Sequence, residues 1–311
     1  MLSLPVSAVV ATRDRPEVFH RTLASLEEQG VLPRELIVVD ASADSRTKEL
    51  LSALDGRSGA ECSISWHAAE IAGAAAQRGQ GSAFATQPVL WFFDDDILFG
   101  PDCFPLLVKA LESDSRLGGV NAMISNQRYL APGRVSRLMF ALMAGRLRST
   151  YAGCVIGPAW NLLPEDRGDL AEVVPVEWLN LTCTLYRREA LPVPLFASQF
   201  TGYSLMEDLG LSLEVGKRWK LANARTARIF HDSQPGSYKS DPMALAEMEL
   251  VNRHFVMTRI LDRNRPVDYA KLFAFELFSL ASSARRSVFG AGLWREAYGK
   301  LKALGRICVR Q

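Results

Sequence analysis

The run Val89-Leu90-Trp91-Phe92-Phe93, followed at once by Asp94-Asp95-Asp96, decides the fold. Five apolar residues without polar alternation indicate a strand buried on both faces of a sheet, so the acids fall at its carboxyl end. Open α/β sheets bind ligands at that end. Crowded carboxylates need a neutralising cation, and their oxygens suit Mg²⁺ or Mn²⁺ carrying substrate phosphates. The stretch therefore predicts a metal-diphosphate site, while a solvated turn that caps the next element is an equally weighted alternative.

The segments before this strand alternate between strand and helix. Residues 6–11 are apolar and β-branched, and Pro16 opens a helical pattern that ends at Gly30. Residues 35–39 form the next expected strand, which ends at Asp40. A strand, a helix and a second strand with short connections are typical of a parallel βαβ unit. The sequence therefore predicts an α/β fold.

The later segments divide the chain into a sheet-forming part and a helical part. In chain order, the expected elements are a strand at residues 177–186, a helix at 207–215, a strand at 222–231 and helices at 242–261 and 269–285. We therefore expect an α/β domain over residues 1–235 and a helical extension over residues 236–311. Residues 116–175 have no pattern that places them securely.

Whole-chain properties exclude several classes of protein. The 311 residues carry a net charge of +2 without a concentrated basic and aromatic footprint, so no nucleic acid polymer is expected as a partner. The five cysteines are widely spaced without a CxxC pair, which disfavours a zinc cluster or a disulfide framework and indicates a reducing cytosol. The N-terminus has no basic region typical of a signal peptide and reads as a first strand. Glu276 interrupts the most apolar stretch, so we expect no membrane-spanning helix. The cysteine pattern indicates a cytoplasmic location.

Asp40 ends the second expected strand, where an acid can accept hydrogen bonds from a ribose or a base edge. A loop acid without this role would look the same. Dinucleotide-binding folds need a GxGxxG turn after the first strand, whereas residues 11–16 read Ala-Thr-Arg-Asp-Arg-Pro. Nicotinamide and flavin cofactors are therefore not expected.

Four further residues have both a functional and a structural interpretation. Glu207 and Asp208 open a helix, where acids favour the helix dipole, but such a pair could also supply a general base. His231 ends a strand and could be a ligand, although a single histidine is more often a surface or satisfied core residue. Arg78 lies on an Ala-rich helix and could pair with phosphate or be an exposed helix cation.

Residues 285–311 contain seven Arg and Lys residues against one acid, Glu296. Helical spacing places apolar residues on one face and basic residues on another: Leu293, Ala297, Leu301 and Leu304 against Arg295, Lys302 and Arg306. A basic amphipathic helix suits anionic lipid headgroups. A terminal helix docked on the domain is an equally simple interpretation.

Several segments taken together resemble family 2 glycosyltransferases of the GT-A fold, including rhamnosyltransferase-like bacterial members. They are residues 6–16, Val-Ser-Ala-Val-Val-Ala-Thr-Arg-Asp-Arg-Pro; 36–44, Leu-Ile-Val-Val-Asp-Ala-Ser-Ala-Asp; and 91–96, Trp-Phe-Phe-Asp-Asp-Asp. Val-Glu-Trp-Leu at 176–179, Tyr-Arg-Arg-Glu-Ala-Leu at 186–191, Met-Glu-Asp at 206–208 and Phe-His at 230–231 follow in the family's order. The resemblance covers residues 4–235. It implies a Rossmann-like, mixed and mostly parallel sheet flanked by helices, with a C-terminal helical extension.

The resemblance also implies roles for individual residues. The nucleotide-binding set would be Thr12, Arg13, Asp40, Arg78, Asp94 and Asp95, with Asp94 near the ribose. Asp96 would coordinate a divalent cation, Mg²⁺ or Mn²⁺, and His231 would add a metal or phosphate contact. Asp208 corresponds to the general base, Glu207 would help to shape the acceptor site, and Trp178 would flank the sugar or acceptor. Residues 180–183, Asn-Leu-Thr-Cys, depart from the small Gly-Ala segment of many members, and the loop around Gly202-Tyr203 also differs.

The implied activity is an inverting transfer of a sugar from a nucleotide-diphospho-sugar to a hydroxyl of a saccharide or lipid-linked acceptor, in surface glycan synthesis. In a single displacement, one base suffices and no covalent intermediate forms. Peripheral contact with anionic lipid on the inner face of the cell membrane is part of this hypothesis. The alternatives are a sugar-phosphate nucleotidyltransferase and a catalytically silent module that binds nucleotide-sugars or glycans.

Overall fold

The computed structural model describes residues 2–55, 62–234, 241–286 and 291–309. The chain forms two compact units: the first unit comprises Met1–Tyr129 and Leu163–Gln234, and the second comprises Leu130–Leu162 and Pro235–Gln311. The predicted domain boundary between residues 235 and 236 lies outside the described residues, so it stays a prediction. Residues 130–162, which the sequence did not place securely, group with the C-terminal helices.

The first unit contains a mixed sheet in the order β3-β2-β1-β4-β10-β6-β11-β5, with β9 paired to β11. Its parallel half consists of β1 (Leu2–Thr12), β2 (Val31–Asp40), β3 (Ser63–Ala68) and β4 (Val89–Asp94). Its other half consists of β5 (Ile97–Phe99), β6 (Leu117–Ile124), β9 (Val173–Val176), β10 (Cys183–Arg187) and β11 (Lys220–His231). Strand β10 runs antiparallel to both β4 and β6. The predicted α/β fold is confirmed.

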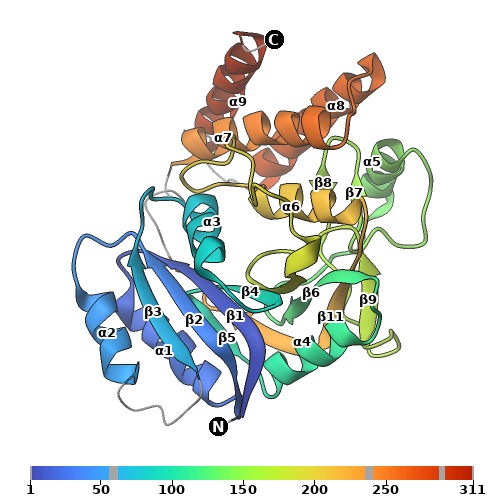
Figure 1. Cartoon of the computed structure of the whole chain (residues 1–311). Helices are drawn as coiled ribbons and strands as arrows, with labels where there is room; N and C mark the ends of the chain where they lie inside the picture. The colour runs from blue at the N-terminus through green and yellow to red at the C-terminus, as the bar shows by residue number, and fades with distance from the viewer. Residues whose placement is uncertain (1, 56–61, 235–240, 287–290, 310–311) are drawn as a thin grey trace. The chain divides into compact units, whose positions relative to one another are not determined.

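Helices cover both faces of this sheet (Figure 1). On one face, α1 (Pro16–Glu27), α2 (Arg46–Asp55) and α4 (Cys103–Glu112) share a core with Val10 and Phe93. On the other face, α6 (Glu207–Gly216) shares a core with Val9 and Phe92. Helix α3 (Ala74–Phe84) packs against Val9 on the same face. Successive residues of a strand point to opposite faces of the sheet. A strand that helices cover on both faces therefore needs apolar residues at every position, as in residues 89–93.

Helix α3 lies unusually close to the sheet because residue 81 is glycine. A Cβ atom at Gly81 would lie 2.5 Å from Cγ1 of Val9 and 3.1 Å from Cγ2 of Val39. Any larger side chain would therefore push α3 away from β1 and β2. This contact fixes the height of Arg78, which α3 carries, above the sheet edge.

The carboxyl ends of β1, β2 and β4 meet at one edge. Thr12 pairs with Asp40, and Ala11 pairs with Asp94. The sequence-based placement of Asp40 and Asp94 at strand ends is confirmed. The three polar residues therefore lie on neighbouring strands at the same edge.

The strand expected at residues 177–186 is shorter in the structure, where β10 begins only at Cys183. The backbone N–H of Leu179 donates to Oγ of Ser212 at 2.9 Å, and the Leu179 carbonyl accepts from the same hydroxyl at 3.1 Å. The Ser212 side chain of α6 thus makes the two backbone hydrogen bonds that a neighbouring strand would otherwise make with Leu179. Two elements that the sequence did not predict, β5 and α4, follow the aspartates directly.

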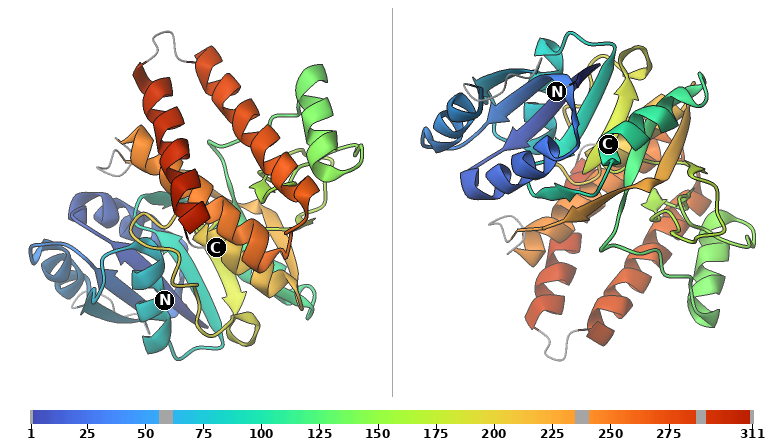
Figure 2. Two further views of the ribbon diagram at one scale, coloured as in Figure 1. Left: turned by 90° about the horizontal axis from the view of Figure 1, so that it is seen from above. Right: turned by 90° about the horizontal axis from the view of Figure 1, so that it is seen from below.

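The second unit consists of α5 (Arg134–Ala144), the strand pair β7 (Val155–Ile156) and β8 (Trp160–Asn161), α7 (Pro242–Phe255), α8 (Pro266–Arg286) and α9 (Ala291–Val309). A π-helical turn, Val256–Ile260, continues α7. Helices α8 and α9 are neighbours in Figures 1 and 2, and the buried Lys300 and Glu276 side chains form an ion pair between them. The predicted helices at 242–261 and 269–285 are present. Among the described residues, no helix is long and apolar enough to cross a bilayer.

The face of α9 that packs inward differs from the predicted apolar face. Leu301 and Leu304 are 63% and 47% exposed, whereas Ala303 is fully buried. A Cβ atom at Gly299 would lie 2.2 Å from the carbonyl oxygen of Met243 in α7. Close approach to α7 at small residues, and not the position of the leucines, therefore sets the rotation of α9.

Candidate active site

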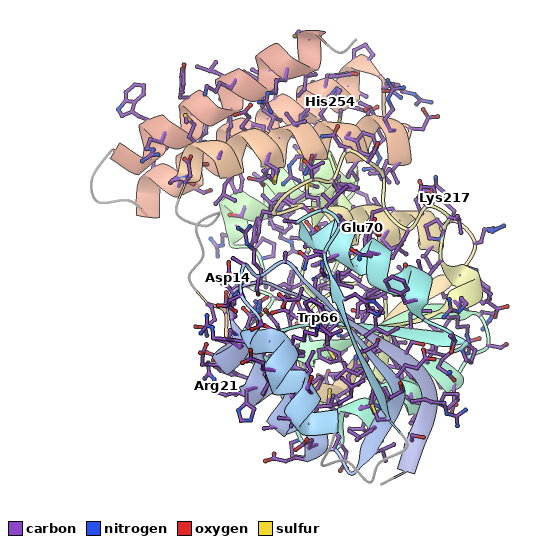
Figure 3. All side chains as sticks on the ribbon, turned by 60° about the vertical axis from the view of Figure 1, so that its left-hand side comes forward. Asp14, Arg21, Trp66, Glu70, Lys217 and His254 are labelled. Carbon is purple, nitrogen blue, oxygen red and sulfur yellow. The ribbon has the colours of Figure 1, made fainter. Side chains whose placement is uncertain are left out.

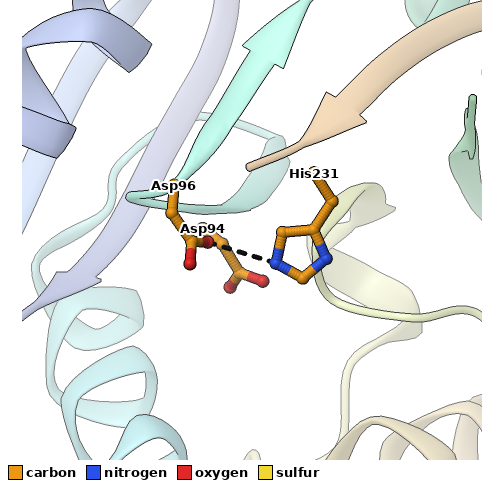
Figure 4. Close-up of side chains that lie close together, drawn as sticks. All are labelled: Asp94, Asp96 and His231. Carbon is orange, nitrogen blue, oxygen red and sulfur yellow. Dashed lines mark ion pairs between the residues drawn. The ribbon is translucent and has the colours of Figure 1, made fainter. Parts of the chain in front are cut away.

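Asp94, Asp96 and His231 form a cluster in which one potential ligand atom of each residue lies within 4.8 Å of the others (Figure 4). Asp94 ends β4, and Asp96 lies two residues further along the chain. His231 is the last residue of β11 and pairs with Ile97 of β5. Strand β5, directly after the aspartates, thus brings the histidine to them. Two carboxylates and an imidazole form a donor set that fits a divalent cation.

Asp96 is buried and surrounded by donors. Nε2 of His231 lies 3.2 Å from Oδ1 of Asp96, and Nη1 of Arg15 lies 3.2 Å from Oδ2. The backbone N–H of Gln234 donates to the same Oδ2 at 3.3 Å. Burial alone would raise the pKa of this carboxyl, but His231, Gln234 and Arg15 together lower it below its ordinary value. Asp96 is therefore held as an anion that can bind a cation.

Asp95 points into the fold and has a different environment. Oγ1 of Thr12 donates to its Oδ2 at 2.6 Å, and Nη1 of Arg15 donates to its Oδ1 at 3.2 Å. Burial raises the pKa of Asp95 to about 6, although Arg15 and Thr12 oppose the rise. The hydrogen bond between Thr12 and Asp95 therefore holds the turn after β1 against the end of β4. The family resemblance implies nucleotide binding for both residues and does not predict this contact.

Arg78 is buried between two carboxylates. Its Nη2 lies 2.5 Å from Oδ1 of Asp94, and its Nη1 lies 2.9 Å from Oε1 of Glu207. Burial alone would lower the pKa of the guanidinium, but the charges of Asp94 and Glu207 outweigh it and raise the pKa. The alternative that Arg78 is an exposed helix cation is wrong.

Backbone contacts explain how Glu207 reaches Arg78. The loop before α6 has positive φ angles at Gly202, Ser204 and Met206, of 61°, 58° and 71°. The N–H of Ala74, at the start of α3, donates to the carbonyl of Gly202 at 3.2 Å. A Cβ atom at Gly73 would lie 2.9 Å from that same carbonyl oxygen, so only glycine fits there. This loop therefore holds the first turn of α6 against the first turn of α3.

Glu207 and Asp208 have raised proton affinities. Burial and the charge of Asp208 raise the pKa of Glu207 to about 8, against the effect of Arg78. Burial likewise raises the pKa of Asp208 to about 6, although the Leu209 N–H donates to its Oδ1 at 2.7 Å. The lower value belongs to Asp208, so Asp208 is the more readily ionised member of the pair. Its raised pKa also suits a group that must accept a proton.

The remaining predicted nucleotide-binding residues lie at the same sheet edge. Asp40 accepts from the backbone N–H of Ser42 at 2.8 Å and from Nε1 of Trp66 at 3.1 Å. Arg13 is exposed, and its Nε lies 3.3 Å from Oδ2 of Asp14. The backbone N–H of Asp14 donates to Oγ of Ser42 at 2.7 Å. The contacts of Asp14 and Asp40 with Ser42 join the turns that follow β1 and β2, and Trp66 of β3 contacts Asp40. Figure 3 labels Asp14 and Trp66. The nucleotide-binding roles of Asp40 and Arg13 stay predictions.

Trp178 lies in the loop before β10 and is only 7% exposed, so little of its ring can meet a ligand in this conformation. Its predicted contact with the sugar or acceptor stays a prediction. The residues that sequence reasoning missed are Arg15 and Tyr203. Burial raises the pKa of Tyr203, and the charges of Asp94 and Glu207 add to this rise. The sequence contained a signal for a residue such as Arg15, because the three adjacent acids at 94–96 require positive charge nearby.

Comparison with known proteins identifies the family. The sequence matches the model of glycosyl transferase family 2 over residues 7–191, more than half of the chain, and the chain belongs to this family. The sequence-based recognition is thereby confirmed. No curated protein matches the sequence.

Three solved structures share the fold at low sequence identity. A mannosyltransferase of Pyrobaculum calidifontis, in complex with GDP-Man and Mn²⁺, has a TM-score of 0.55 and 15% identity over 99% of this chain and 76% of its own. TarS of S. aureus, residues 1–349 in complex with UDP-GlcNAc, has a TM-score of 0.53 and 16% identity over 88% and 71%. GalNAc-T7, with UDP, GalNAc and Mn²⁺, has a TM-score of 0.55 and 16% identity over 81% and 47%. The predicted GT-A fold is confirmed, and the family and fold are those of a transferase.

Proposed function

We propose that this chain is an inverting, metal-dependent glycosyltransferase. It moves a sugar from a nucleotide-diphospho-sugar to a hydroxyl of a saccharide or lipid-linked acceptor in surface glycan synthesis. One observation carries the proposal. The Arg78 guanidinium contacts both Asp94, one of the three candidate metal ligands, and Glu207, the neighbour of Asp208. The candidate donor-binding and proton-accepting groups are therefore parts of one site.

On the donor side, Asp94, Asp96 and His231 would hold the divalent cation. The cation, when bound, would offset the negative charge of the departing nucleoside diphosphate. Arg13 and Asp40 would contact the nucleotide from the turns after β1 and β2. The solved structures that share the fold support this assignment, since the P. calidifontis enzyme is in complex with GDP-Man and Mn²⁺ and TarS with UDP-GlcNAc.

On the acceptor side, Asp208 would take the proton from the attacking hydroxyl. A base opposite the leaving group permits one displacement at the anomeric carbon, which inverts its configuration. Glu207 stays beside it and, held by Arg78, fixes the first turn of α6. Trp178 would flank the sugar or the acceptor through the small part of its ring that is exposed.

Product analysis tests this proposal. Full-length protein is incubated with a panel of nucleotide sugars, Mn²⁺ and saccharide or lipid-linked acceptors, and the released nucleotide is identified. We expect a nucleoside diphosphate and a glycosylated acceptor, and we expect the Asp208→Asn variant to lose transfer. Glu214→Gln, an acid on the same helix paired with Lys217, is the matched control and should keep full activity. Release of pyrophosphate would instead favour a nucleotidyltransferase, and binding without turnover would favour a silent module.

We also propose a cytoplasmic location with peripheral contact at the inner face of the cell membrane. The excess of Arg and Lys in residues 285–311 supports the membrane contact. The side chains of Arg285, Arg286 and Arg310 lie outside the described residues.

A further inference from the structure

Helix α8 exposes a continuous apolar stripe. The exposed residues between Pro266 and Ala284 recur at helical spacing, and each is uncharged: Pro266, Val267, Ala270, Phe273, Leu277, Ala281 and Ala284. Phe273 and Leu277 are 65% and 52% exposed. A helix on the surface of a water-soluble domain normally turns charged or polar residues outward. This stripe therefore indicates a face that meets an apolar phase or a partner.

Helices α9 and α5 expose similar stripes with basic borders. On α9, Trp294, Tyr298 and Leu301 are 77%, 55% and 63% exposed at spacings of four and three residues. Lys302 and Arg306 are exposed beside them. On α5, Leu138 and Leu142 are 71% and 55% exposed, and the adjacent Arg134 and Arg137 are exposed as well. No Asp or Glu occurs among the exposed residues described for these three helices.

These exposed side chains are concentrated in one part of the chain. Of the fifteen large apolar side chains exposed in the described ranges, eleven belong to the second unit. The second unit comprises 33 and 77 residues of the 311, about a third of the chain. The distribution is therefore not the scatter of single apolar residues found on ordinary surfaces.

The charge is segregated in the same way. The residues of the second unit include 17 Lys and Arg against 7 Asp and Glu, a net charge of +10. Those of the first unit include 19 against 27, a net charge of −8, which accounts for the total of +2. A unit with a charge of +10 repels a second copy of itself and attracts an anionic surface.

We propose that the stripes of α5, α8 and α9 form a docking surface for an anionic lipid bilayer. Phe273, Leu277 and Trp294 enter the boundary between headgroups and acyl chains, while the bordering Arg and Lys side chains contact lipid phosphates. Tryptophan and tyrosine favour that boundary because each has an apolar ring and a polar N–H or O–H. The inference deepens the proposed function, since it assigns the acceptor to a lipid at the same bilayer, but docking itself requires no catalysis.

Vesicle flotation with the full-length protein tests the surface. Wild type is mixed with vesicles of phosphatidylcholine containing phosphatidylglycerol, or of phosphatidylcholine alone. We expect strong binding only to the anionic vesicles, weakened by added salt. The double variants Phe273→Glu/Leu277→Glu and Trp294→Glu/Tyr298→Glu should each lower the partition coefficient by about tenfold or more. Arg137→Glu/Lys302→Glu should lower it by at least about fivefold per residue.

The matched control makes the same apolar-to-acid change in the first unit. Ile71 and Val193 are 69% and 99% exposed, so Ile71→Glu/Val193→Glu should bind vesicles like wild type. Equal binding by wild type and both apolar double variants would overturn the proposal. A wild-type dimer in analytical ultracentrifugation that the apolar variants dissociate, with vesicle binding unchanged, would assign the stripes to a second copy instead. Transfer to a water-soluble acceptor, measured on the same variants, should stay unchanged, so failure of the docking surface and failure of the proposed activity give different results.

Discussion

Arg78 of α3 and Glu207 of α6, 129 positions apart in the sequence, form a buried ion pair with 2.9 Å between Nη1 and Oε1. The same guanidinium reaches Asp94 at the end of β4. A single buried cation thus neutralises one acid from each half of the candidate site. Removing it would leave two carboxylates without their partner in a water-poor environment.

Arg78→Ala should therefore destabilise the first unit by about 3–5 kcal/mol, which is the cost of breaking a buried ion pair from one side. Urea denaturation followed by tryptophan fluorescence measures this change. Lys217→Ala is the control, because the exposed Lys217 side chain forms a surface ion pair with Glu214 and its loss should cost within about 0.5 kcal/mol. Similar stabilities for the two variants would contradict the bridging role.

The pH dependence of transfer should have an acidic limb set by the Glu207-Asp208 pair. The pKa of Asp208 is raised to about 6, and the proposed base must be ionised to accept a proton. Activity should therefore be retained above about pH 6 and fall about tenfold per pH unit below it. The measurement is kcat/KM from pH 4.5 to 8.5. A limb at the ordinary carboxyl value near pH 4 would argue against Asp208 as the base.

Arg15 should weaken the binding of a divalent cation in the absence of nucleotide. Its Nη1 contacts both Asp95 and Asp96, so its charge competes with a metal ion for these carboxylates. Arg15→Gln should therefore tighten the binding of Mn²⁺ alone by roughly fivefold, the effect of about 1 kcal/mol of removed repulsion. Electron paramagnetic resonance of free Mn²⁺ reports the affinity. Arg21→Gln, which removes an exposed charge paired with Asp232, should leave it unchanged.

Two glycines of α9 should respond oppositely to alanine. A Cβ atom at Gly299 would collide with the Met243 carbonyl, whereas nothing lies within 4 Å of one at Gly305. Gly299→Ala should thus destabilise the second unit by about 1–3 kcal/mol. Gly305→Ala should stabilise α9 by up to about 1 kcal/mol, because alanine favours the helix. Thermal unfolding measures both, and equal midpoints would show that α9 does not pack on α7 as described.

The sequence was sufficient to predict the positions of those candidate site residues that lie at strand ends. Asp40, Asp94 and His231 each end a strand, and a buried apolar run or a β-branched pattern marks that strand directly. Glu207 and Asp208 open a helix as expected. Local periodicity decides these features, so no knowledge of distant contacts was needed.

Features that depend on distant contacts could not be predicted. The burial of Arg78 requires α3 and the loop before α6 to meet through Gly73 and Gly202, a contact with no local signal. Residues 130–162 pack with helices more than eighty positions away, which explains why their own pattern was ambiguous. The inward face of α9 has no local signal either, because the leucine spacing marks one apolar face, while Gly299 and Ala303 permit the closest approach to α7 on another.

Calorimetry of nucleotide binding tests the central claim most directly. GDP and UDP are titrated into wild type, Asp96→Asn, Asp208→Asn and the control Asp102→Asn, each with Mn²⁺ and with EDTA. We predict that wild type binds one of the nucleotides only with Mn²⁺, that Asp96→Asn lowers this affinity by about tenfold or more, and that Asp208→Asn and Asp102→Asn bind like wild type. Equal affinity with Mn²⁺ and with EDTA, in wild type and Asp96→Asn alike, would contradict a metal-held diphosphate at this sheet edge.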